Sequence, residues 1–220
     1  MAEQVIKNNI AEISGRVVSE FAYSHEVYGE GFYSFDVEVP RLSDSYDVIP
    51  VMVSERLLDV TASYVGQYVI AQGQFRSYNK HEDGKSRLLL SVFIREIHIV
   101  SEPADGNPNS IFLDGYICKK PIYRKTPLGR EITDLLLAVN RPYNKSDYIP
   151  AIAWGRNARY AQNLEVGTNL CIWGRIQSRT YQKKVGDTQI STKTAYEVSI
   201  SKMEISRPET SKKEEDKLGE

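Results

Sequence analysis

A tandem repeat with a spacing of about 100 residues constrains the fold of this chain more than any other feature of its sequence. Three pairs of blocks share that offset: SGRV at 14–17 and DGYI at 114–117, VPR at 39–41 and VNR at 139–141, DVIP at 47–50 and DYIP at 147–150. Val65-Gly66 and Val166-Gly167 pair one residue further apart, as do Gly73 and Gly174. A nearly constant offset over several blocks predicts the duplication of one domain.

Each copy has the pattern of a small β-barrel. In the first copy, apolar and alternating runs predict strands at residues 10–18, 33–39, 48–53, 68–75 and 87–100. Ser54 is a suitable N-cap for a short helix that Gly66 ends, and the second copy predicts its helix at 157–164. Five strands with a helix between the third and fourth follow the order of the OB-fold. The predicted fold class is all-β, with two tandem five-stranded OB barrels.

Composition sets the predicted domain boundaries. Residues 101–108 are rich in Pro, Gly and Asx and predict a linker, so the first domain is expected at 1–103 and the second at 107–206. Residues 207–220 contain one leucine, no aromatic residue and mixed charges, which is typical of a disordered tail.

Charge separates the two copies. Residues 1–106 hold 9 Lys and Arg against 16 Asp and Glu, a net charge of −7. Residues 107–206 hold 15 against 8, a net charge of +7. The basic second copy is therefore the candidate for binding a polyanion, whereas the acidic first copy is expected to serve chiefly in assembly or protein interaction.

Cations and tyrosines alternate along residues 135–154, where two apolar runs flank a polar turn. Arg141 and Lys145 stand on either side of Tyr143, and Tyr148 opens the second run. Single-stranded nucleic acid is bound by such a combination, because cations attract the phosphates and flat rings stack on the bases. An ordinary solvated hairpin with half-buried tyrosines is the alternative.

The second copy also resembles a known family. The segments LLLAVNRPY, DYIPAIAWG, NLEVGTNLCIWGRIQSRTY and YEVSISKMEI are similar to bacterial single-stranded DNA-binding proteins, the SSB family, over nearly all of residues 109–206. The first copy is a weaker match. Two such domains in one chain resemble the tandem form of the family, which implies a homodimer with four OB domains.

The resemblance implies that aromatic side chains at four positions stack on bases. These positions fall on Tyr143, Tyr148, Trp154 and Tyr181 in the second copy. For Trp154, packing in the core is a rival interpretation. The same positions in the first copy carry no ring, being Ser43, Val48, Ser54 and Lys80, although a shift in register would allow Tyr46 and Tyr78 to compensate.

Basic residues near these rings are the candidates for phosphate contact. Arg141, Arg175 and Arg179 are expected to be the best placed, and the predicted DNA-binding set also includes Arg124, Lys145, Arg156 and Lys183. The family commonly ends in aspartates followed by Pro-Phe, whereas this chain ends in EEDKLGE. That departure puts recruitment of replication and repair proteins through the tip in doubt.

Other functional classes find no support in the sequence. The Gly29-Glu30-Gly31 segment lacks the strand-to-helix context of a phosphate loop and predicts a hairpin turn. Cys118 and Cys171 lie within apolar runs and predict buried reduced thiols, with a single disulfide as the alternative. No enzyme, metal site or cofactor is predicted. With no signal peptide or membrane segment, the expected location is the cytoplasm, at the nucleoid.

The predicted function is sequence-independent binding and protection of single-stranded DNA in replication, recombination and repair. Two alternatives stay open at this stage. One is an OB-fold adaptor that binds proteins of the replication or recombination machinery, and the other is a protein that binds single-stranded RNA.

Overall fold

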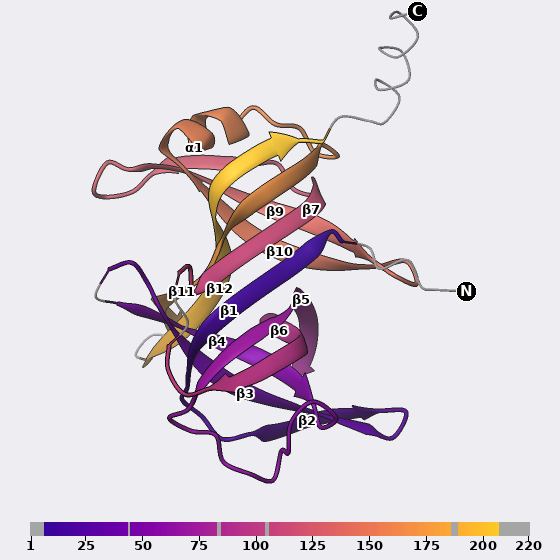
Figure 1. Cartoon of the computed structure of the whole chain (residues 1–220). Coiled ribbons are helices and arrows are strands. Elements are labelled where there is room, and N and C mark those ends of the chain that lie inside the picture. The colour runs from indigo at the N-terminus through magenta and orange to yellow at the C-terminus, as the bar shows by residue number, and fades with distance from the viewer. Residues whose placement is uncertain (1–6, 44, 83–84, 104–105, 186–188, 207–220) are drawn as a thin grey trace, which may run out of the picture.

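The computed structural model describes residues 7–206 except 44, 83–84, 104–105 and 186–188; for residues 80–82, 85–87, 183–185 and 189–191 it describes the backbone alone. Within these residues, twelve strands form one continuous sheet that curls into two barrels (Figure 1). Strands β1 to β6 make up the first half, and strands β7 to β12 with helix α1 make up the second half. The predicted tail lies outside the described residues.

The first half is a closed barrel of five strands with one additional strand at its edge. Strand β1 pairs with both β5 and β3, and β4 runs parallel to β6. These five strands close a ring in the order expected for an OB-fold. All five predicted strands are present. The strands are β1 (Asn9–Val17), β2 (Ala22–Val27), β3 (Glu30–Pro40), β4 (Tyr46–Ser54), β5 (Tyr68–Glu82) and β6 (Lys85–Val100).

The second half repeats this topology. Strand β7 pairs with β11 and β9, and β10 runs parallel to β12. Its elements are β7 (Asn109–Ile117), β8 (Ile122–Lys125), β9 (Glu131–Arg141), β10 (Lys145–Trp154), α1 (Gly155–Ala161), β11 (Asn169–Val185) and β12 (Gln189–Ile205). The predicted second-half helix is therefore present, although it begins and ends earlier than the sequence indicated.

The helix predicted in the first half does not form. Residues 55–67 are turns and bends instead. The Asp59 carboxylate accepts hydrogen bonds from the Thr61 amide at 3.0 Å and the Thr61 hydroxyl at 2.6 Å. Such a local side-chain turn competes with the helical hydrogen bonds of the backbone. The Ser54 hydroxyl does accept a hydrogen bond from the Arg56 amide at 3.1 Å, but no helix follows it.

Strands β2 and β8 were not predicted. The turn predicted around Gly29 is confirmed: Tyr28 and Gly29 have positive φ angles of 51° and 77° and join β2 to β3. Positive φ at both central residues is typical of the tight hairpin turn whose twist matches that of the strands. Strand β8 forms the corresponding hairpin with β9.

Alternating side chains build the core. Along β7 every second residue is buried, and the same alternation runs through β1, β4 and β10. Side chains on one face of each strand therefore fill the barrels, while the other face is left for solvent or ligand. Fully buried members of the core include Ile13, Val37, Ile49, Phe75, Leu113, Leu137, Ile149, Leu170 and Ile176.

The paired glycines of the repeat occupy equivalent bulges. Strand register shifts between Gln72 and Gly73 in β5, and between Trp173 and Gly174 in β11. A Cβ at Gly73 would lie 2.1 Å from the Phe93 carbonyl oxygen, and one at Gly174 would lie 2.1 Å from the Ser199 carbonyl oxygen. Only glycine permits this close approach of two backbones, which explains why both positions keep it.

The two halves join through antiparallel pairing of β1 with β7, with Ala11 opposite Ile111 at its centre. Asn9 and Asn109 stabilise the two ends of this seam in the same way. The Asn9 side chain bonds the Phe75 amide and carbonyl, at 2.9 and 2.8 Å. The Asn109 side chain bonds the same groups of Ile176, at 2.8 and 2.7 Å. The sheet of the first half is therefore continuous with the sheet of the second half.

The repeated Asp-X-Ile-Pro segments supply a second connection between the halves. The Asp47 side chain, 1% exposed, accepts hydrogen bonds from the Ser178 amide at 2.6 Å and from Arg41 at 2.6 and 2.8 Å. Arg175 of the second half adds an ion pair to Asp47 at 3.0 Å. We refer to these four residues as the Asp47 contact.

The Asp147 contact is its counterpart on the other side of the seam. Asp147, also 1% exposed, accepts a hydrogen bond from the Ser77 amide at 2.8 Å and forms an ion pair with Arg141 at 3.1 Å. The Ser77 hydroxyl accepts a hydrogen bond from the Tyr148 amide at 2.8 Å. Each half therefore inserts a serine of its long hairpin beside a buried aspartate of the other half.

None of the helices in the described part of the chain has the length and apolar character that crossing a membrane requires.

Candidate nucleic-acid interface

The outward face of strands β10, β12 and β11 carries five of the eleven predicted site residues. Ile152 of β10 lies opposite Ser199 of β12, which lies opposite Arg175 of β11, so these three side chains share a face. Side chains alternate along a strand. The same face therefore also carries Tyr148, Trp154, Arg179 and Tyr181.

Three tyrosine rings are accessible in this region. Tyr143 is 87% exposed, Tyr148 is 44% exposed and Tyr181 is 39% exposed. Tyr143 lies in the β9–β10 turn and has a positive φ of 61°. The Arg179 guanidinium lies 5.9 Å from the centroid of the Tyr181 ring. Cation and ring are thus adjacent on β11, as stacking of a base with its phosphate nearby requires.

Trp154 is only partly available to a ligand. It directly precedes α1 and lies opposite Ile132, which is 2% exposed. The indole Nε1 donates a hydrogen bond to the Ser199 hydroxyl at 3.0 Å. The ring is therefore tied to β12 and is partly buried, which agrees with a packing role as much as with stacking.

Four of the predicted phosphate-binding arginines have carboxylate partners. Arg141 and Arg175 belong to the Asp147 and Asp47 contacts, and their side chains are 29% and 36% exposed. Arg124 pairs with Asp134 at 2.7 Å, and Arg179 lies 3.9 Å from Glu197. Among the three arginines expected to be best placed, Arg179 is the most exposed, at 55%.

Lys145 and Arg156 are exposed, and neither forms an ion pair within the described residues. Lys145 lies opposite Arg141 at the tip of the β9–β10 hairpin, beside Tyr143. The side chain of Lys183 lies outside the described residues, although its backbone belongs to β11. Lys145, Arg156 and Arg179 are more accessible to a phosphate group than Arg141 and Arg175, which already pair with buried aspartates.

The strands of the first half pair in the same register as those of the second half, but the four positions equivalent to the predicted stacking residues carry no aromatic ring. Val48 lies opposite Glu38 as Tyr148 lies opposite Ala138. Tyr78, which is 65% exposed, takes the place of Arg179 on the outward face, because Tyr78 directly follows Ser77 just as Arg179 directly follows Ser178. Tyr46 is instead opposite Pro40.

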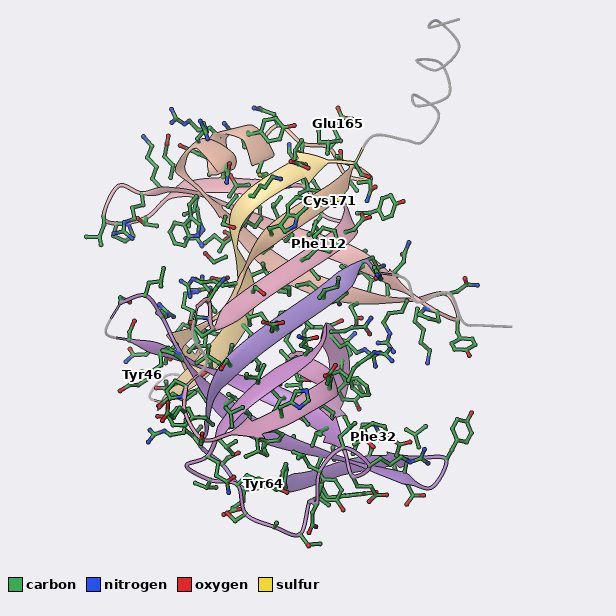
Figure 2. All side chains as sticks on the ribbon, in the orientation of Figure 1. Phe32, Tyr46, Tyr64, Phe112, Glu165 and Cys171 are labelled. Atoms are coloured by element: carbon green, nitrogen blue, oxygen red, sulfur yellow. The ribbon has the colours of Figure 1, made fainter. Side chains whose placement is uncertain are left out.

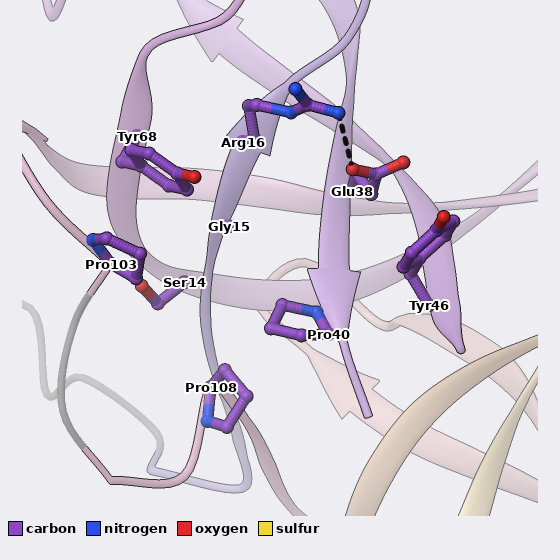
Figure 3. Close-up of a pocket in the computed structure, with 9 residues that line it drawn as sticks. All are labelled: Ser14, Gly15, Arg16, Glu38, Pro40, Tyr46, Tyr68, Pro103 and Pro108. Carbon is purple, nitrogen blue, oxygen red and sulfur yellow. Dashed lines mark hydrogen bonds and ion pairs between the residues drawn. The ribbon is translucent and has the colours of Figure 1, made fainter. Parts of the chain in front are cut away.

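Tyr46 lines a hollow in the first half together with Tyr68 and the Arg16–Glu38 ion pair (Figure 3). Pro103 and Pro108 of the segment between the halves close another side of it. None of the predicted site residues lines this hollow, so it is separate from the face described above.

Sequence reasoning missed two groups of residues near the interface. Tyr116, 44% exposed, lies opposite Ala138, which lies opposite Tyr148, so Tyr116 is a further accessible ring on the outward face. Asp47 and Asp147 were quoted as part of the repeat without a role. The signal in the sequence was the repetition of an aspartate beside apolar residues, because a carboxylate that the fold buries requires partners.

Within the described residues, no three His, Cys, Asp or Glu side chains are grouped so as to hold a metal ion. Cys118 and Cys171 are both free, so the alternative of a disulfide is wrong. They are partly buried, less deeply than predicted, and this burial raises the pKa of both thiols.

Fold and site together define a tandem OB-fold protein with an outward face of tyrosines and cations. The family model for the single-strand binding protein family matches residues 108–206. A single-stranded DNA-binding protein of Clostridium tetani is 35% identical over 91 residues, which cover 38% of this chain and 63% of that protein. Single-stranded DNA-binding protein 3 of Clostridium acetobutylicum is 32% identical over 96 residues, covering 40% and 67%.

The chain belongs to the single-strand binding protein family. Its match spans less than two thirds of the Clostridium tetani relative. The wild-type single-stranded DNA-binding protein from Thermus aquaticus has the same fold over both halves, with a TM-score of 0.68 at 18% identity and coverage of 91% of this chain and 93% of that one.

Proposed function

We propose that this protein binds single-stranded DNA without regard to sequence, chiefly through its second half. The observation that carries the proposal is the outward face that Tyr148, Tyr181 and Arg179 share, with Tyr143 at the tip of the β9–β10 hairpin. The names of the relatives support the same ligand.

Binding is non-covalent in this proposal. Bases stack on the exposed rings, and phosphates lie near Lys145, Arg156 and Arg179. Each stacked base contributes about 1–3 kcal/mol by alanine substitution, and one OB domain covers roughly 4–16 nucleotides. Every base presents a flat π-face, so stacking supplies affinity without reading sequence. Such a protein would protect exposed single strands during replication, recombination and repair, at the nucleoid in the cytoplasm.

The test of this function is a competition experiment. A labelled oligo(dT) is bound to the full chain, and unlabelled oligo(dT), oligo(U) or duplex DNA is added. We expect oligo(dT) to compete most strongly and duplex DNA least, because only unpaired bases offer both faces for stacking. Preference for oligo(U) would reassign the ligand to RNA, and no binding of any of the three would overturn the function.

Salt dependence gives a further prediction. Phosphate contacts release counterions, so log affinity for a single strand falls with log salt concentration at a slope of about −0.7 per contact. The three exposed cations Lys145, Arg156 and Arg179 predict a slope of roughly −2 or steeper. Titrations of oligo(dT) at several salt concentrations measure it. The variant Arg179→Gln should reduce the slope by somewhat less than one, and a slope near zero would contradict phosphate contact.

The first half is proposed to serve in assembly, and the surface of the seam suits pairing with a second copy. Ile10, 48% exposed, lies opposite Phe112, and the Phe112 and Trp173 rings lie 5.1 Å apart. Figure 2 shows Phe112 on the face turned toward the viewer, where β1, β7 and β11 run side by side. An apolar cluster at the centre of a broad sheet face is typical of a subunit contact.

We expect a homodimer with four OB barrels that uses this apolar cluster. The variant Phe112→Glu should convert the dimer to a monomer at micromolar concentration, because it places a charge in the contact. Static light scattering measures the mass, and Tyr160→Glu on α1 is the matched control, which should remain dimeric. A monomeric unmodified protein at micromolar concentration would overturn the assembly.

A further inference from the structure

The two serines at the buried aspartates use their hydroxyl groups differently. The Ser178 hydroxyl donates a hydrogen bond to Asp47 at 3.1 Å. The Ser77 hydroxyl lies 3.5 Å from Asp147, at the outer limit of a hydrogen bond, and accepts a shorter one, at 2.8 Å, from the Tyr148 amide. Ser77 of the first half is therefore bonded directly to the backbone of a residue on the outward face of the second half.

One position of the repeat makes the Asp147 contact depend more on its serine. Arg175 pairs with Asp47 at 3.0 Å, whereas the equivalent position in the first half is Gln74, which is uncharged. The Oδ2 atom of Asp147 is buried and has no hydrogen-bond partner among the described residues. Ser77 therefore supplies a larger share of the Asp147 contact than its counterpart supplies at Asp47.

The seam between the halves holds Ser77 in place. Ser77 lies on β5 opposite Leu90, which is 7% exposed. Two residues earlier, Phe75 is fully buried, and the Asn9 side chain bonds both its amide and its carbonyl. Strands β5 and β10 are in contact although they are not neighbours in the sheet. The Ser77 hydroxyl is thus a fixed point against which the start of β10 is placed.

The Tyr148 ring is not held by a hydrogen bond of its own. The Trp154 indole is bonded to the Ser199 hydroxyl, whereas the Tyr148 hydroxyl has no hydrogen-bond partner where the structure describes the chain. On β9 the residue opposite Tyr148 is Ala138, whose methyl group offers the ring little to pack against. The position of the ring is therefore set largely by the backbone of β10, and the amide of that backbone at Tyr148 is bonded to Ser77.

We propose that Ser77 is a positioning residue for Tyr148: it holds the Tyr148 amide so that the ring stands open to a base on the outward face. The inference rests on the proposed function, because the position of the ring matters only if the ring takes part in binding. It gives the first half an indirect part in DNA binding, through the start of β10 and without contact with the nucleic acid.

A double-mutant cycle in the full chain tests this inference. Fluorescence anisotropy at one salt concentration measures affinity for an oligo(dT) of about 10 nucleotides, which fits a single OB domain. We expect Ser77→Ala to bind about threefold to tenfold more weakly, the range that one neutral hydrogen bond covers. Because Ser77 acts through Tyr148, the same substitution should have no effect in the Tyr148→Ala background and its full effect in the Tyr181→Ala background.

Two further variants separate positioning from stability. Ser77→Thr keeps a hydroxyl at the same place and should restore the affinity. Ser178→Ala removes the equivalent hydroxyl, which bonds Asp47 and not the backbone of a stacking residue. We expect urea denaturation to show a similar loss of stability for Ser178→Ala and Ser77→Ala, whereas only Ser77→Ala should weaken binding.

Amide hydrogen exchange followed by NMR measures the bond itself in the absence of DNA. The Tyr148 amide should exchange about tenfold or more faster in Ser77→Ala than in the unmodified protein, because it loses its acceptor. The Phe75 amide, which is bonded to Asn9, should keep its rate. An unchanged exchange rate at Tyr148 would contradict the positioning role.

The outcomes of the cycle distinguish this inference from the function itself. If the unmodified protein does not bind the oligonucleotide, the proposed function fails and the positioning role fails with it. If the unmodified protein binds and Ser77→Ala binds equally well, only this inference is overturned. The same holds if Ser77→Ala weakens binding by an equal factor in the Tyr148→Ala background, because Ser77 would then act by another route.

Discussion

Replacing Tyr148 and Tyr181 together by alanine is expected to weaken oligo(dT) binding at least about thirtyfold. The two rings are exposed on one face, and each stacked base contributes about 1–3 kcal/mol, so that the pair supplies about 2–6 kcal/mol. Fluorescence anisotropy with a labelled oligonucleotide at one fixed salt concentration measures the loss. The salt slope should hardly change, because rings release no counterions.

Two comparisons make this result specific. Tyr148→Phe with Tyr181→Phe keeps both flat faces and should bind nearly as well as the unmodified protein. Tyr46→Ala removes a ring that is 61% exposed beside the hollow of the first half, outside the proposed path, and should have no effect. Unchanged affinity of the double alanine variant would show that bases do not stack on these two rings.

Asp47→Ala is expected to lower the free energy of unfolding by about 3 kcal/mol or more. Removing one partner of a buried ion pair typically costs about 3–5 kcal/mol, because the remaining charges lose their compensation. Arg41 and Arg175 both depend on this carboxylate, and so does the Ser178 amide. Urea denaturation measures the change. Asp134→Ala, which removes a partly exposed partner of Arg124, should cost less than about 1 kcal/mol.

The pH dependence of this difference is a second readout of the Asp47 contact. Burial acts to raise the pKa of Asp47, but hydrogen bonds from Arg41 and Ser178 outweigh it and leave that pKa below its ordinary value. A carboxyl whose pKa is lower in the folded than in the unfolded state stabilises the fold above about pH 4, near the unfolded value. The stabilisation is lost as pH falls through the folded pKa. The gap between the unmodified protein and Asp47→Ala should therefore narrow below about pH 4, and a gap of constant size would contradict the ion pair.

The sequence was sufficient to predict the barrels because their determinants are local. Alternating apolar residues located all five first-half strands, and the repeat extended the assignment to the second half. The missing first-half helix shows where local signals compete: Ser54 favoured a helix, whereas Asp59 with Thr61 formed a side-chain turn. Which of these two hydrogen-bonding patterns forms depends on packing against the rest of the protein, and a short segment of sequence does not show that packing.

The interface was predictable in part for a similar reason. Tyr148, Tyr181 and Arg179 share a face because strand alternation and pairing place them there, and both follow from the sequence pattern. The ion pairs of Arg141 with Asp147 and of Arg175 with Asp47 were harder to predict, because they can be identified only once the strand register is known. The exposed ring of Tyr116 was missed because it lies on β7, outside the segment in which cations and tyrosines alternate.

Covalent linkage of the two barrels has a consequence for dilute conditions. Pairing of β1 with β7 is intramolecular, so mass action does not oppose it, whereas the proposed association with a second copy would weaken as concentration falls. At high dilution the protein is thus expected to act as a monomer, in which two different barrels are held in one fixed arrangement. A polynucleotide laid across such a unit meets different ends, and its 5′-to-3′ direction becomes distinguishable, which two identical barrels related by symmetry could not achieve.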